Sequence, residues 1–198
     1  MKYYLFIVFF LLVRSSLCQS QKALLDNIAS KYFTVVPEGK SLKEITEALE
    51  TNISLKIDTT IPKTDTSLFY MRGYSDSFNP FDIPVSKIEI LLMQGVMKAR
   101  GYITTNDTLL VLQIIAVTDS SEEIKKILKS EVARINKEIG YPDDHLTYKK
   151  SKRKGRIAFE SYVYNRLPRP YVFLTYGWGA YYYNTKIKCL SLSIHFKN

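Results

Sequence analysis

A strand-and-helix unit over residues 108–140 is the feature that most constrains the fold. The run Leu109–Val117 (LLVLQIIAV) is almost wholly apolar and rich in β-branched residues, which favours a strand buried on both faces. Ser120 and Glu123 then have the spacing of a capping box. Apolar residues recur at helical spacing until Gly140, which suits a helix end. The unit predicts a core scaffold and carries no catalytic motif.

The first 18 residues have the pattern of a secretory signal peptide. A basic start precedes nine apolar residues, Leu5–Val13, and mostly small residues follow up to Cys18. We therefore predict cleavage before Gln19 and a secreted or periplasmic protein, because the apolar run is too short to span a membrane. In the alternative interpretation Cys18 becomes a lipid-modified first residue, although bulky Leu17 stands where a small residue is expected.

The predicted mature chain, residues 19–198, is basic and contains one cysteine, Cys189. It has 26 Lys and Arg against 19 Asp and Glu, which gives a net charge of +7. Charge of this sign attracts an anionic surface, such as lipid or polysaccharide, or an acidic protein, although spread lysines also serve solubility alone. Nucleic acid is not the partner that we favour. One cysteine forms no internal disulfide, so the apolar core must stabilise the domain.

The remaining pattern predicts one α+β domain, residues 19–198, with an antiparallel β-sheet and helices packed mainly on one face. Ser41 and Glu44 form another capping-box spacing. The expected elements are helices at 19–33 and 41–51 and strands at 53–61, 68–74, 146–149, 156–164 and 187–196.

Two segments are harder to assign. Residues 86–101 contain a short apolar run that suits either a helix or a buried strand, and the spacing of Ile88, Leu91 and Leu92 favours a helix. The segment Gly177-Trp178-Gly179 stands between two aromatic runs. We predict that it is the bend of a hairpin, with Trp178 exposed.

Two features of the C-terminal third are candidate binding elements. In Lys149–Arg156 (KKSKRKGR) six of eight residues are basic, which predicts either an anion-binding segment or a solvated turn. The aromatic residues at 171–183 predict either a contact surface or the filling of a twisted sheet. The predicted binding residues are Lys149, Lys150, Lys152, Arg153, Lys154, Arg156, Tyr176, Trp178 and Tyr181.

An enzyme is the alternative, with Asp143, Asp144 and His145 as metal ligands or as an acid and base. The same residues also suit a polar loop after a helix. The chain has two histidines, and the second, His195, is predicted to face solvent from the last strand. It has no G-x-S-x-G, H-E-x-x-H, C-x-x-C or phosphate-binding glycine loop. We therefore predict a non-enzymatic binding protein without a cofactor.

Overall fold

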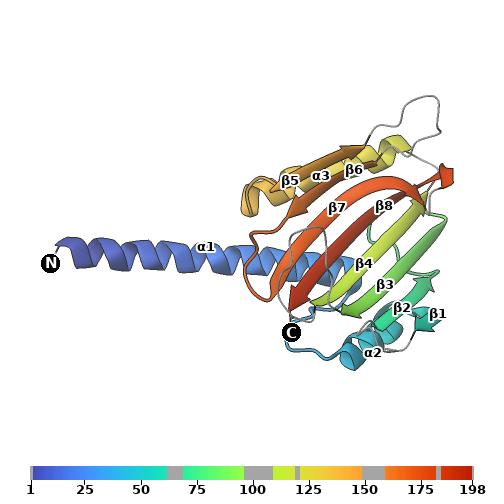
Figure 1. The fold of residues 1–198 in the computed structure, drawn as a ribbon, viewed down its shortest axis with the longest axis horizontal. Coiled ribbons are helices and arrows are strands. Elements are labelled where there is room, and N and C mark those ends of the chain that lie inside the picture. Colours follow the sequence, from blue (N-terminus) through green and yellow to red (C-terminus); the bar gives the residue numbers. More distant parts are fainter. Residues whose placement is uncertain are drawn as a thin grey trace.

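The computed structural model describes residues 2–61, 69–95, 109–118, 121–148, 159–181 and 184–197. Within these ranges the helices are α1 (Lys2–Phe33), α2 (Leu42–Ile53) and α3 (Ser121–Glu138). The strands are β1 (Lys56–Ile61), β2 (Phe69–Ser75), β3 (Lys87–Gly95), β4 (Leu109–Thr118), β5 (Asp144–Tyr148), β6 (Phe159–Tyr164), β7 (Tyr171–Tyr181) and β8 (Asn184–Lys197). Figure 1 shows their arrangement.

The described strands form one antiparallel sheet in the order β1-β2-β3-β4-β8-β7-β6-β5, with the helices on one side (Figure 1). Strands β1 to β4 follow one another along the sheet, and α3 then leads to the opposite edge. Strands β5 to β8 return toward the middle, where β8 pairs with β4. Each half is thus a helical segment followed by four strands. The predicted α+β fold with a one-sided helical layer is confirmed.

The main core lies between the helices and the sheet face that they cover. On β4 and β8, alternate apolar residues point to this core, as the period of a strand requires. They are Leu110, Leu112, Ile114, Leu190, Leu192, Ile194 and Phe196, each at most 2% exposed. On the other face of β4, Ile115 and Val117 pack with Leu91 in a smaller cluster. Strand β4 is therefore apolar on both faces, as its unbroken sequence pattern predicts.

The helix predicted at residues 41–51 begins with the expected capping box. Ser41 Oγ accepts a hydrogen bond from the Glu44 amide at 3.3 Å, and Glu44 Oε2 accepts one from the Ser41 amide at 2.7 Å. This reciprocal pair satisfies amides that the first turn of a helix leaves free. The corresponding residue before α3, Ser120, lies outside the described residues.

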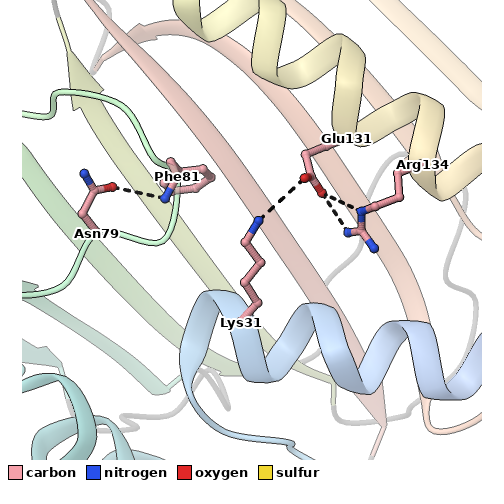
Figure 2. Close-up of polar contacts among 5 residues, drawn as sticks. All are labelled: Lys31, Asn79, Phe81, Glu131 and Arg134. Atoms are coloured by element: carbon pink, nitrogen blue, oxygen red, sulfur yellow. Dashed lines mark hydrogen bonds and ion pairs between the residues drawn. The ribbon is translucent and has the colours of Figure 1, made fainter.

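Helix α3 is anchored over the sheet by a polar contact with α1. Figure 2 shows Lys31 of α1 directed toward Glu131 of α3, with 3.7 Å between Nζ and Oε1. Arg134 donates to the same carboxylate at 2.8 Å through Nη2. Beside α3, the segment after β2 is folded on itself, since Asn79 Oδ1 accepts from the Phe81 amide at 3.2 Å (Figure 2). Of these contacts, the one between Lys31 and Glu131 joins α3 to α1.

The prediction of a helix at residues 86–101 is wrong for the part of this segment that the structure describes. Residues Lys87–Gly95 form β3, which pairs with β2 on one side and β4 on the other. Ile88 and Ile90 face the helices, whereas Leu91 faces the opposite side. Burial on both faces produces apolar residues at every spacing, so helical periodicity was misleading here.

The bend predicted at Gly177-Trp178-Gly179 is also wrong, because β7 continues through all three residues. The glycines allow β6 to approach closely. A Cβ on Gly177 would lie 2.6 Å from the carbonyl oxygen of Glu160, and one on Gly179 would lie 3.1 Å from Cβ of Phe159. Lack of a side chain, rather than freedom to turn, accounts for both glycines.

The N-terminal half of α1 extends away from the rest of the molecule (Figure 1). Leu11, Leu12 and Leu17 are 60%, 62% and 54% exposed, whereas Leu25 and Phe33, further along, are fully buried. Among the described residues, none of the helices combines the length and apolarity needed to cross a membrane. Cleavage before Gln19 stays a prediction.

The close approach at Gly177 predicts a large difference between two similar substitutions. Gly177→Ala should destabilise the protein by about 1–3 kcal/mol, because its methyl group meets backbone that cannot move alone. Gly179→Ala should cost less, since its neighbour is a side-chain atom. Urea unfolding of both variants gives the measurement. Equal and negligible losses would mean that these glycines do not lie in a packed strand.

Candidate functional site

A polar cluster forms around Glu160 at the start of β6. Glu160 Oε1 accepts a hydrogen bond from Tyr162 Oη at 2.7 Å and lies 3.1 Å from Nε2 of His145. Its other oxygen, Oε2, accepts one from Nε1 of Trp178 at 3.2 Å. Lys125 completes the group, with Nζ 5.2 Å from the centre of the Trp178 ring. We call these five residues the Glu160 cluster.

Strand register explains why the cluster forms. Glu160 is directly opposite Trp178 on β7, and Tyr162 is directly opposite His145 on β5. Residues two apart on a strand share a face, so all four side chains lie together. The His145 and Tyr162 rings stack at 4.3 Å with an interplanar angle of 8°. Lys125 comes from α3 and makes a cation–π contact with the indole.

The environment of Glu160 favours its charged form. Partial burial opposes ionisation, but the hydrogen bonds from Tyr162, Trp178 and His145 outweigh burial and lower the pKa of Glu160. Burial and the neighbouring carboxylate raise the pKa of Tyr162 to about 12. At neutral pH the cluster therefore holds a fixed carboxylate and a neutral phenol. Neither group is tuned for proton transfer near pH 7, which a general acid or base would need.

The predicted basic run, Lys149–Arg156, lies outside the described residues. The residues on either side of the gap at 149–158, Tyr148 and Phe159, are paired with each other across β5 and β6. Phe159 directly precedes Glu160. The two described residues that flank the gap therefore lie beside the Glu160 cluster. Tyr181, which the sequence analysis predicts to be a binding residue, is the last residue of β7.

Two of the predicted binding residues, Tyr176 and Trp178, are less exposed than a bend at 177–179 would have left them. Tyr176 is 0% exposed and packs near Tyr32, with 6.3 Å between the ring centres. Burial raises the pKa of its phenol well above the usual range. Trp178 is only partly buried and packs against the core. Because Tyr176 is inaccessible, the contact surface that we consider further includes Trp178 and omits Tyr176.

Asp143, Asp144 and His145 do not converge on one point. Asp143 accepts from the Asn165 amide at 2.7 Å and pairs with Arg166 Nε at 2.8 Å. Asp144 and His145 are consecutive in β5, so their side chains leave opposite faces of the sheet. In the ranges that the structure describes, no group of three or more His, Cys, Asp or Glu is placed to hold a metal ion.

His195 is less accessible than the sequence predicts. Its ring packs edge-on against Phe173, with 5.5 Å between the ring centres, and Nδ1 is buried. Burial lowers the pKa of His195 to about 4, so its imidazole is neutral at physiological pH. Sequence alternation assigns the correct face of β8, but it does not show that this face is partly covered.

The sequence analysis missed Glu160, Tyr162 and Lys125. One signal was available for the first two, because a strand at 156–164 places residues 160 and 162 on the same face. Their pairing with His145 and Trp178 depends on the register of three strands. Lys125 is one of several lysines in its helix, and only tertiary packing brings it to Trp178.

Comparisons of the chain with protein-family models, curated proteins and solved structures found no match. Inference about function therefore depends on the geometry described above.

The Glu160 cluster predicts a pH-dependent contribution to stability. Glu160→Gln should lower the free energy of unfolding by about 1 kcal/mol at neutral pH, because charge-assisted hydrogen bonds are weakened at a partly exposed site. The folded-state pKa of Glu160 is lowered, so its stabilisation is present above the ordinary glutamate pKa of 4.5 and is lost as pH falls through the folded-state value. The difference between the two proteins should therefore shrink in acid.

Urea unfolding at several pH values, followed by fluorescence of the single tryptophan, Trp178, measures this difference at the site itself. Glu47→Gln is a matched control, because Glu47 is 58% exposed on α2. A pH-independent difference for Glu160→Gln would contradict the assignment of a charged hydrogen-bond acceptor.

Proposed function

We propose that the protein is a secreted or envelope-located, non-enzymatic binding protein whose partner is anionic. The partner would be held at the end of the sheet that carries the Glu160 cluster. The observation that carries this proposal is the pairing of Tyr148 with Phe159, because these two residues flank the gap that contains the basic run, and Phe159 directly precedes Glu160. The proposal combines the positive charge of the run with the aromatic surface of the Glu160 cluster.

The two components would have different roles in binding. Basic residues of the run, Lys152, Arg153 and Lys154 among them, would attract phosphate, sulfate or carboxylate groups over a distance. The partly exposed rings of Trp178 and His145 would contribute contact area at short range. Glu160 holds both rings in place through its hydrogen bonds. A prearranged contact surface loses less conformational freedom on binding.

The proposed location is supported by the start of the chain. Leu11, Leu12 and Leu17 are exposed on the part of α1 that extends from the body (Figure 1). Apolar side chains without a place in the core suit a segment with a role in targeting, which fits the signal-peptide pattern of residues 1–18. Removal of that segment would leave the buried residues from Leu24 onward in place.

The enzyme alternative has less support. Asp143 is occupied by Arg166 and by the Asn165 amide. His145 is directed to Glu160 and stacks on Tyr162. An enzyme that uses Asp143, Asp144 and His145 should lose most of its activity in at least one of the three alanine variants, whereas the proposed binding should survive Asp143→Ala and Asp144→Ala.

Charge reversal of the basic run tests the proposed function. The mature protein, residues 19–198, should bind anionic phospholipid vesicles or dextran sulfate at low salt and be released as salt rises. The triple variant Lys152→Glu, Arg153→Glu and Lys154→Glu should bind at least about tenfold more weakly, because the local attraction is reversed. Cosedimentation with vesicles and retention on dextran sulfate measure the two interactions.

A control variant has the same net charge with reversals at exposed positions elsewhere, Lys43→Glu, Lys129→Glu and Lys137→Glu. It should keep most of the binding. Equal loss in both triple variants would mean that only overall charge matters, and it would remove the assignment to the basic run. If capture from a source extract instead yields one acidic protein, that protein replaces the lipid or polysaccharide as the partner.

A further inference from the structure

His195 lies near the end of β8, on the face of the sheet that points away from the helices, since Ile194 and Phe196 beside it point to the main core. It is directly opposite Val111 on β4 and Phe173 on β7. Nδ1 of its ring is buried and, in the part of the chain that the structure describes, has no hydrogen-bond partner. A buried polar atom without a partner reduces stability, and a buried charge without one reduces it further.

Protonation would create such a charge, because the three strands around the ring, β4, β7 and β8, contain no Asp or Glu. The neighbours of the ring on its own face of these strands are Ser193 and Lys197 of β8, Leu109, Val111 and Gln113 of β4, and Phe173 and Thr175 of β7. Lys197 is the charged residue among them, and a lysine repels an imidazolium. Burial lowers the pKa of His195 from the ordinary value of 6.5 to about 4, so the ring is neutral in the folded protein at pH 7.

The two sides of β8 differ in how regularly they are paired near His195. The register with β4 is regular up to the pair of Leu109 with Lys197. The register with β7 shifts between Tyr171 and Phe173, directly beside His195, and this irregularity interrupts the ladder. Ends of strands open at a lower free energy than their interiors. The start of β7 is therefore the part of the sheet that can move away from the ring at the lowest cost.

We propose that His195 is an acid-sensitive switch: when its ring gains a proton, the start of β7, at residues 171–173, separates from the end of β8, at residues 195–197. The imidazolium would then reach water through the opened side. Tyr171 also connects β7 to α1, because its hydroxyl donates a hydrogen bond to Asp26 Oδ1 at 2.6 Å. The opening would break this contact and loosen the attachment of α1 to the sheet.

The pH range of the switch follows from the pKa of the ring in the closed and open forms. Above the ordinary value of 6.5 the ring is neutral in both forms, so the closed form keeps its full stability. As pH falls from 6.5 toward about 4, the open form binds a proton that the closed form excludes, and opening becomes about tenfold more favourable per pH unit. Glu160 loses its contribution only below the ordinary glutamate pKa of 4.5, so the two effects are separable. The switch does not depend on the proposed function.

Hydrogen exchange of the mature protein, followed by mass spectrometry between about pH 7.5 and pH 5, tests the proposal. After correction for the intrinsic exchange rate at each pH, the segment at residues 171–173 should lose protection by about tenfold per pH unit below 6.5. Strand β4 should keep its protection, because its pairing with β3 and β8 does not involve the moving segment. An equal loss in both regions would mean that the whole sheet unfolds, and it would overturn the proposed local opening.

Replacement of each histidine identifies the group that gains the proton, since the chain has two, His145 and His195. His195→Phe cannot be protonated and should keep the same protection at residues 171–173 across this pH range. His195→Gln gives the same test if the larger ring disturbs folding, which circular dichroism measures. His145→Gln should retain the acid response. A response that survives replacement of His195, or a wild type without any response, would overturn the proposal.

Discussion

The pairing of β4 with β8 is the constraint on which the rest of the structure depends. It joins the two halves of the sheet through a regular register from Leu109 opposite Lys197 to Thr118 opposite Lys188. A slip of one residue would turn the core-facing side chains of one strand away from the helices, so apolar burial strongly specifies this register. The positions of β7, β6 and β5 follow from it, because each pairs in turn with the strand before it.

The Glu160 cluster shows how this register produces a local chemical environment. Its residues come from β5, β6, β7 and α3, and none of them is adjacent in sequence to another. The contact of Lys31 with Glu131, shown in Figure 2, helps to keep α3 over the sheet. Helix α3 in turn places Lys125 above Trp178. A carboxylate with a lowered pKa and three hydrogen-bonding neighbours suits the positioning of rings better than the movement of protons.

Elements were predicted correctly where the residue pattern fits only one type of secondary structure. The capping box at Ser41, the apolar strand β4 and the alternating strand β8 are confirmed. The errors at β3 and at Gly177-Trp178-Gly179 have a common cause, because both depend on tertiary pairing. Because β3 is buried on both faces, its apolar residues also fit the spacing of a helix. Close contact between β7 and β6 requires glycines, which analysis of the local sequence assigns to a turn. The Glu160 cluster lay beyond prediction because strand register is not encoded in any one segment.

The state of Cys189 agrees with the proposed location outside the cell. The side chain packs against the small cluster of Leu91, Ile115 and Val117 on the sheet face away from the helices. Burial raises the pKa of its thiol to about 11, so it is protonated at neutral pH and a poor nucleophile. A thiol in this state resists oxidation and exchange, whereas an exposed thiolate would form mixed disulfides in an oxidising compartment. In the predicted mature chain, Cys189 is the one cysteine, and its packing leaves the apolar core to stabilise the domain without a disulfide.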